Sequence, residues 1–152
     1  MQIIQFTTLI LLLLVTGVFW GPWLGIHRAI NVFTKEEFIK ITKTMAANLG
    51  RPMQILMPLC ILFMLLSIFF YPKKNCIEFY LIIASFCSIT VTLVVTLTTE
   101  LPIVNQIKQW TVETMPSDWE GIRDKWARFH SLRVFPSLIS FGLYLSAILF
   151  FS

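Results

Sequence analysis

Apolar positions fall into four long runs along the chain, and polar positions gather between them. A helix needs about 20 apolar residues to cross the hydrocarbon core of a bilayer, because no water is present there to bond the backbone N–H and C=O groups. Four runs reach or approach that length, at about residues 1–23, 52–71, 76–99 and 134–151. The pattern therefore predicts an all-α fold, a four-transmembrane-helix up-and-down bundle that forms a single membrane domain over residues 1–152.

The connections between these runs differ greatly in length. Residues 72–75 form a tight turn, whereas residues 24–51 and 100–133 form two long connections. Four crossings place both long connections on one side of the membrane, opposite the turn and both termini. Each long connection carries five Lys or Arg residues and the turn carries two, which favours cytoplasmic long connections. We expect the membrane to be a bacterial inner membrane. The first run lacks the basic start and the A-x-A-like site of a cleaved signal peptide, so we expect a retained helix.

Both long connections contain signals for helices. Thr34 followed by Glu37 is a capping box, and the apolar residues after it share one face, which predicts an interfacial helix in the first connection. Pro116 and the four residues after it indicate a helix start in the third connection, continuous with the fourth apolar run.

Composition supports a membrane protein and narrows its chemistry. The chain is 57% hydrophobic and 13% charged, against about 25% charged in soluble domains. The net charge of +4 comes from bases beside the apolar runs, which indicates contact with anionic lipid headgroups and no nucleic-acid partner. The three cysteines have no metal-site spacing, and no nucleotide-binding or zinc-protease motif occurs. We therefore expect no metal ion and no resident cofactor.

Small residues recur every fourth position at the end of the first run, at Gly17, Gly21 and Gly25. This spacing allows close approach of another backbone or a flat ligand, and it makes a homo-oligomer through this face possible. Pro22 should kink or end the helix near Trp20 and Trp23, whose indoles suit the membrane interface.

Hydroxyl side chains form a stripe in the third run. They share one helical face, at Ser85, Ser88, Thr92, Thr96 and Thr99. Hydrogen bonds between helices explain such a stripe, and a polar cavity is the alternative.

Two groups of polar residues are candidates for chemistry. Glu100 and Asn105 follow the hydroxyl stripe at or near membrane depth, where an ionisable group is costly and is a functional candidate. Spacings of 4, 3, 4 and 3 place five residues on one face of the helix that enters the fourth run, namely Trp119, Arg123, Trp126, His130 and Arg133. This face can stack a planar aromatic, stabilise an oxyanion and move a proton, or it can anchor lipid headgroups.

His27 and Arg28 lie at the end of the first run, on the same side of the membrane as these groups. Both could contribute to binding a substrate there. His27 and His130 could also ligate a haem from two helices, although only their shared side supports the pairing.

Two stretches of the sequence carry a resemblance to a known family. One combines Gly17-Val-Phe-Trp-Gly-Pro with the segment from Ile41 to Pro58, and the other runs from Glu100-Leu-Pro-x-x-Asn105 through Trp110 to Arg133. The second stretch includes Pro116-x-x-Trp119, Trp126 and His130. Together they resemble the anthrone oxygenase-like family of small four-helix membrane proteins.

The resemblance implies oxidation of a planar anthrone to an anthraquinone by O₂ without a cofactor. Under this hypothesis His130 is the base, Arg133 and Arg123 stabilise the anion, and Glu100 or Asn105 orients the substrate. Trp119 and Trp126 would stack on its rings. The alternative is a non-catalytic membrane module that binds a lipid, a quinone or a partner subunit.

Overall fold

The computed structural model describes residues 1–150, and this part of the chain contains helices and no strand. The helices are α1 (Gln2–Gly25), a 3-10 segment η1 (His27–Val32), α2 (Lys35–Phe70), α3 (Ile77–Val95), a π-helical turn η2 (Thr96–Glu100), α4 (Leu101–Lys108) and α5 (Trp119–Phe150). The predicted end of the fourth run at Phe151 lies outside the described residues.

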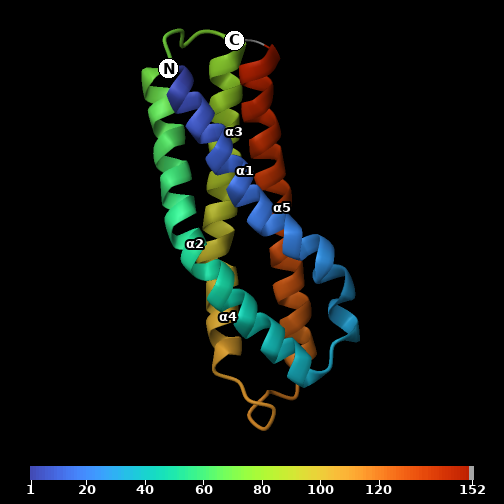
Figure 1. The fold of residues 1–152 in the computed structure, drawn as a ribbon. Helices are drawn as coiled ribbons and strands as arrows, with labels where there is room; N and C mark the ends of the chain where they lie inside the picture. Colours follow the sequence, from blue (N-terminus) through green and yellow to red (C-terminus); the bar gives the residue numbers. More distant parts are fainter. Residues whose placement is uncertain (151–152) are drawn as a thin grey trace.

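Four helical segments are long and apolar enough to cross a membrane, as predicted. They cover Gln2–Val32, Lys35–Phe70, Ile77–Lys108 and Trp119–Phe150. Both ends of the described chain and the short turn after α2 lie at one end of the bundle, and the long connections lie at the other (Figure 1). The chain is therefore a multi-pass membrane protein with an all-helical fold.

The helices are longer than the hydrocarbon core requires. The 36 residues of α2 span about 54 Å at 1.5 Å per residue, against a core of about 30 Å. Its first half therefore extends past the core on the side of the long connections, where α2 turns away from the bundle axis (Figure 1).

The helix predicted after Thr34 is not a separate element, because it continues directly into the second span. The capping box itself is confirmed: Thr34 N donates to Glu37 Oε2 at 2.8 Å, and Glu37 N donates back to Thr34 Oγ1 at 3.4 Å. Pro52 and Pro58 both lie inside α2. A proline inside a spanning helix is tolerated where neighbouring groups compensate for the lost bond.

Pro22 lies inside α1, and the helix ends soon after it, close to Trp23, as the sequence predicted. The helix continues to Gly25, and Ile26 N still donates to Pro22 O at 2.9 Å. Only then does the chain tighten into η1, which carries His27 towards α5.

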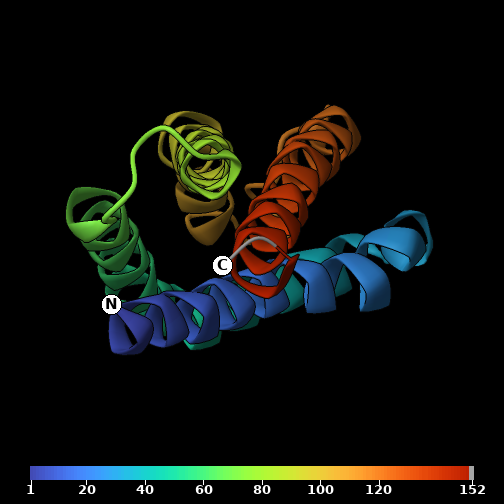
Figure 2. The same ribbon diagram turned by 90° about the horizontal axis from the view of Figure 1, so that it is seen from above.

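The bundle is built around the contact of α3 with α5, the most extensive between any two helices, while α1 lies across α2 and α5 (Figure 2). Hydroxyls of the predicted stripe donate to carbonyl oxygens of α5: Ser85 to Ser140 at 2.7 Å, Ser88 to Pro136 at 2.8 Å and Thr92 to Arg133 at 3.1 Å. Ser140 Oγ returns a bond to Ser85 O at 2.9 Å. This part of the stripe thus joins two helices directly, as the hydrogen-bonding alternative predicted.

Replacing Ser140 with Ala should remove the bond from Ser140 Oγ to Ser85 O and the contact between the two hydroxyls, while Ser85 can still donate to the backbone carbonyl of residue 140. Interhelical hydrogen bonds in membranes contribute about 0.6 to 1.7 kcal/mol, so we expect a loss of about 1 kcal/mol in the free energy of unfolding. Unfolding by SDS in mixed micelles measures it. Cys87→Ala, on the exposed side of α3, is the matched control and should change nothing. An equal loss in both variants would contradict the role of the serine pair.

The glycine face does not pack within the chain. A Cβ built on Gly17, Gly21 or Gly25 meets no atom within 4 Å, so all three positions border open space. The close helix contact that their spacing suggests is therefore not made inside the bundle. A homo-oligomer through this face stays a prediction.

Candidate functional site

The π-helical turn η2 determines which way Glu100 faces. In an uninterrupted α-helix each residue turns by about 100°, so Glu100, eight positions after Thr92, would lie about 80° away from the stripe that contacts α5. A π turn holds more residues per turn and therefore rotates each of them less. The result is a Glu100 side chain that faces the bundle and is 1% exposed.

Glu100 meets His130 and Arg133 of α5 in a buried cluster. Glu100 Oε1 lies 3.3 Å from Arg133 Nε and 3.6 Å from His130 Nδ1. Arg133 Nη2 and Nε lie 2.8 and 3.2 Å from His130 Nδ1. The guanidinium also sits over the Phe19 ring, 4.8 Å from its centroid. The structure thus brings together all three residues that the sequence suggested as catalytic.

The hydrogen bonds of the cluster fix the form of His130. A guanidinium has donors and no acceptor, so His130 Nδ1 must be the acceptor and a neutral ring carries its proton on Nε2. That Nε2–H has no partner among the described residues. Neither carboxylate oxygen of Glu100 has a hydrogen-bond partner among the described residues. Oε1 is within ion-pairing distance of Arg133 Nε, but the Nε–H of Arg133 points at His130 Nδ1 instead. Buried polar atoms without partners cost about 1–3 kcal/mol each, which makes this cluster a functional candidate.

Aromatic rings line up beside this cluster. His130 stacks with Trp126 at a centroid distance of 5.5 Å and with His27 at 6.4 Å. The row continues from His27 to Trp23 at 5.8 Å and from Trp23 to Trp20 at 5.1 Å. These two tryptophans therefore belong to an extended stack, in addition to any role at the membrane interface.

The stack argues against the haem alternative. A haem iron binds imidazole nitrogens in the plane of each ring, with the iron between two facing nitrogens. His27 and His130 instead present ring faces to each other, at an interplanar angle of 28°.

Trp119 and Arg123 lie about three and two turns before His130 on α5 and pair with each other. The Arg123 guanidinium sits 5.2 Å from the centre of the Trp119 ring, and its Nη2 pairs with Asp124 Oδ1 at 2.9 Å. Phe38 of α2 packs between Trp119 and Trp126, at centroid distances of 5.7 and 6.3 Å. Phe38, Trp119 and Trp126 belong to one group of buried apolar side chains. Trp126 connects this group to His130 of the cluster.

The remaining predicted residues are not brought to the cluster. Asn105 is exposed on α4, where its Oδ1 accepts from Lys108 Nζ at 3.4 Å, and Arg28 is exposed on η1. Conversely, sequence reasoning missed Phe19 and Phe38 as neighbours of the site. Phe38 had a signal, its place on the apolar face after the capping box, whereas Phe19 is one apolar residue among many.

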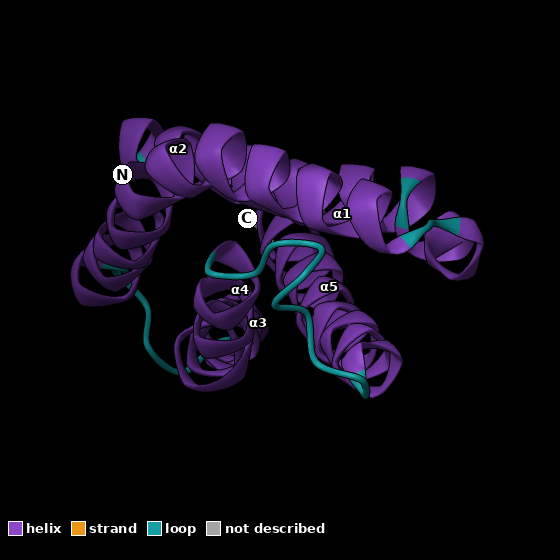
Figure 3. Cartoon of the chain, turned by 90° about the horizontal axis from the view of Figure 1, so that it is seen from below, coloured by secondary structure: helices purple, strands orange, loops and turns teal. Residues whose placement is uncertain are grey.

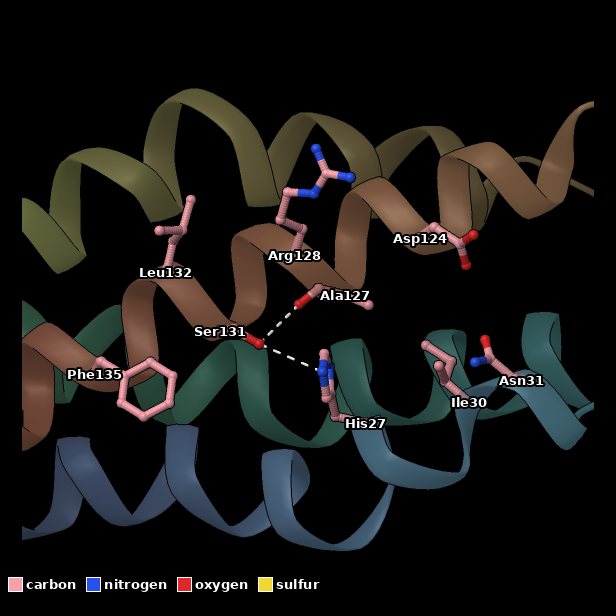
Figure 4. Close-up of a pocket in the computed structure, with 9 residues that line it drawn as sticks. All are labelled: His27, Ile30, Asn31, Asp124, Ala127, Arg128, Ser131, Leu132 and Phe135. Atoms are coloured by element: carbon pink, nitrogen blue, oxygen red, sulfur yellow. Dashed lines mark hydrogen bonds between the residues drawn. The ribbon is translucent and has the colours of Figure 1, made fainter.

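A groove of about 450 Å³ lies on the outer side of His27 and is open to the surroundings. Figure 4 shows η1 forming one wall and α5 the other, with Ala127 and Ser131 between them. The lining residues are His27, Ile30, Asn31, Asp124, Ala127, Arg128, Ser131, Leu132 and Phe135. His27 is thus a member both of the groove wall and of the ring stack.

Comparison with known proteins agrees with the resemblance in the sequence. The family model described as anthrone oxygenase matches residues 46–143, from within α2 to within α5. The matched range contains Glu100, Trp126, His130 and Arg133, but not α1 or His27. No curated protein and no solved structure matches the chain. Because the family match covers more than half of the sequence, the protein belongs to the anthrone oxygenase family.

Proposed function

We propose that this protein oxidises an electron-rich planar aromatic of the anthrone type with O₂, using the Glu100, His130 and Arg133 cluster and no resident cofactor. The observation that carries the proposal is a buried carboxylate, imidazole and guanidinium in contact, with polar atoms that lack partners. The family match supports the same reaction class.

The reaction needs no external reductant. A base removes one proton from the ring methylene of the anthrone, and the resulting anion, with its charge on the keto oxygen, gives electrons to O₂. A carbon–oxygen bond forms at the former methylene carbon. Loss of the second hydrogen as a proton and cleavage of the O–O bond then give the new carbonyl and water. The carbon gives up four electrons and O₂ takes up the same four.

The cluster suggests a division of roles that differs from the one implied by the resemblance. His130 Nδ1 is occupied by Arg133 and its Nε2 carries the proton, so His130 is suited to donate a hydrogen bond to the developing oxyanion. Glu100 has an unpartnered oxygen and is the better candidate for the base. Arg133 stabilises the negative charge both while it is on Glu100 and after it has moved to the substrate oxygen. Trp126 offers a ring face to the substrate.

The test is to follow anthrone conversion and O₂ uptake by the purified protein in detergent micelles. We expect anthraquinone to form with one O₂ consumed per anthrone, at a rate proportional to protein concentration. The rate should persist after treatment with a metal chelator, and empty micelles give the background. No rate above that background would sink the proposal.

The groove beside His27 favours a second candidate function, non-catalytic binding of a lipid or quinone. It is wide enough for a small ligand and lies outside the buried cluster. Under this alternative the protein retains a lipid or quinone on native mass spectrometry and shows no turnover of anthrone.

We further propose that the protein resides in a bacterial inner membrane with its long connections in the cytoplasm. The distribution of basic residues, five in each long connection against two in the turn, supports this orientation. Labelling of a cysteine placed at Asn75, in a variant without native cysteines, by a membrane-impermeant maleimide on intact cells tests this. Labelling only after cell lysis would contradict it.

A further inference from the structure

A second groove, with a volume of about 390 Å³, lies between the end of α1 and the first half of α2. These two segments run obliquely across the same face of the bundle (Figure 1). Gly21 and Gly25 form part of one wall, and Thr44 and Asn48 form part of the other. All four residues are exposed at the surface. The groove shares no lining residue with the groove beside His27.

The second groove lies where the protein leaves the membrane on the side of the long connections. On α1, Gly21 lies between Trp20 and Trp23 in the sequence, and tryptophan indoles suit the level of the lipid headgroups. On α2, Arg51 is the last charged residue before Lys73, so the apolar part of the helix begins directly after it. The groove therefore opens towards the headgroups of one leaflet.

A cation borders the α2 wall of the groove. Arg51 lies seven positions after Thr44, which places it about 20° away around α2 and about 10 Å further along the helix. The Arg51 side chain is exposed and has no ion pair or hydrogen bond with any described residue. The Thr44 hydroxyl and the Asn48 amide have no hydrogen bond with a described residue either. No acid is among the lining residues, so the groove and its border carry a positive charge.

The same face of α2 becomes apolar beyond Arg51. Ile55 and Leu62 lie within about 20° of Thr44 around the helix, and both are exposed. A ligand on this face meets polar groups and a cation at one end and exposed apolar side chains at the other. A phospholipid has the same order of groups, with a charged head at the interface and acyl chains in the hydrocarbon core.

We propose that this groove binds one anionic glycerophospholipid of the surrounding membrane. Its phosphate contacts Arg51, its head lies between α1 and the side chains of Thr44 and Asn48, and its acyl chains follow Ile55 and Leu62. Basic sites between spanning helices at the membrane surface suit anionic headgroups. The inference goes beyond the proposed oxidation and does not depend on it, because no residue of the buried cluster takes part.

The test compares phosphatidylglycerol with phosphatidylcholine of the same acyl chains, added to the purified protein in micelles of a neutral detergent. Native mass spectrometry counts the lipids retained, and a titration gives the affinity for each. We expect about fivefold tighter binding of phosphatidylglycerol, the factor that one basic side chain contributes near an anionic lipid. Arg51→Gln should abolish this preference. Lys35→Gln, which changes an exposed base at the start of α2, is the matched control and should keep it.

Two glycines of α1 provide a matched pair of variants for the groove itself. A Cβ on Gly17 or Gly21 meets no atom within 4 Å, so a leucine fits at either position without displacing the chain. Only Gly21 lines the groove. Gly21→Leu should therefore abolish retention of phosphatidylglycerol, whereas Gly17→Leu should leave it unchanged.

Three outcomes would overturn the inference. They are equal binding of both lipids by the wild type, equal effects of the two leucine variants, and a lipid that is still retained by Gly21→Leu. A dimer without lipid that Gly21→Leu dissociates would also overturn it, since a second copy of the chain would then occupy the groove. If Gly21→Leu does not fold, Arg51→Gln decides the question, because it changes only an exposed side chain.

The lipid site and the proposed oxidation can fail separately. Loss of the preference for phosphatidylglycerol in Arg51→Gln requires no turnover, so a protein that does not oxidise anthrone can still support this inference. Oxidation of anthrone by a protein that binds both lipids equally would sink the inference and leave the proposed function intact.

Discussion

Replacing Glu100 with Gln is expected to slow anthrone oxidation by about 10²- to 10⁴-fold, the range that loss of a general base produces. The amide has nearly the same shape as the carboxylate but cannot take up a proton. The fold should survive, because the amide oxygen can still accept a hydrogen bond from Arg133, and the Arg133 side chain left without a counter-ion is 16% exposed against 1% for Glu100. Steady-state kcat in detergent micelles measures the effect. Glu120→Gln, an exposed acid in the first turn of α5, is the matched control and should keep the wild-type rate.

The same assay separates Glu100 from His130 as the base. His130→Asn keeps an N–H donor in the cluster, so it should cost less than about tenfold if His130 only donates to the oxyanion. A large loss in His130→Asn with a small one in Glu100→Gln would reverse the assignment and restore the role that the resemblance implies.

Replacing Arg133 with Met is expected to destabilise the protein by about 3–5 kcal/mol. The change leaves Glu100 as a buried carboxylate without a counter-ion, and removing one partner of a buried ion pair has an effect of this size. The methionine preserves much of the apolar contact with Phe19, so lost packing contributes little. The free energy of unfolding in SDS-containing mixed micelles measures it.

The double variant Glu100→Leu with Arg133→Met shows whether charge is the cause. Replacement of a whole buried ion pair by apolar residues is often neutral or stabilising by about 1–4 kcal/mol. We therefore expect the double variant to unfold at least as late as the wild type while losing all oxidation activity. If the double variant is as unstable as Arg133→Met alone, packing and not the unpaired charge explains the loss.

The expected instability of Arg133→Met and the expected stability of the double variant bear on why the protein has this cluster. A bundle of apolar helices gains little stability from a carboxylate held beside an imidazole with atoms unbonded, and apolar residues would pack there at no penalty. Both results together would show that the cluster lowers stability, which is expected where polar groups serve chemistry rather than folding.

The connection between α4 and α5 closes one end of the bundle. Residues 109–118 pass beneath the ends of both helices (Figure 3), and Lys43 of α2 donates to Trp110 O at 2.7 Å. This bond ties the connection to α2. The sequence alone gave no means of placing this contact.

Much of the fold follows from the sequence by itself. Four apolar runs that carry a single charged residue among them, Glu78, predict spanning helices, because the bilayer leaves backbone groups no other partner. The spacing of residues 119 to 133 also placed Trp126, His130 and Arg133 on one face, since α-helical periodicity holds without interruption through α5. The capping box at Thr34 could also be predicted, because it involves only residues that are close together in the sequence.

The tertiary structure decided how these elements meet. Simple α-helical spacing puts Glu100 off the stripe, and only the π turn directs it at His130. Asn105 belongs to the same sequence motif as Glu100. It faces outward because α4 resumes α-helical geometry after the π turn. His27 reaches the cluster because α1 packs against α5 and His27 follows shortly after the end of α1, which brings together residues about 100 positions apart. Periodicity determines the face of a single helix, but the contacts between helices depend on packing, which the sequence pattern does not record.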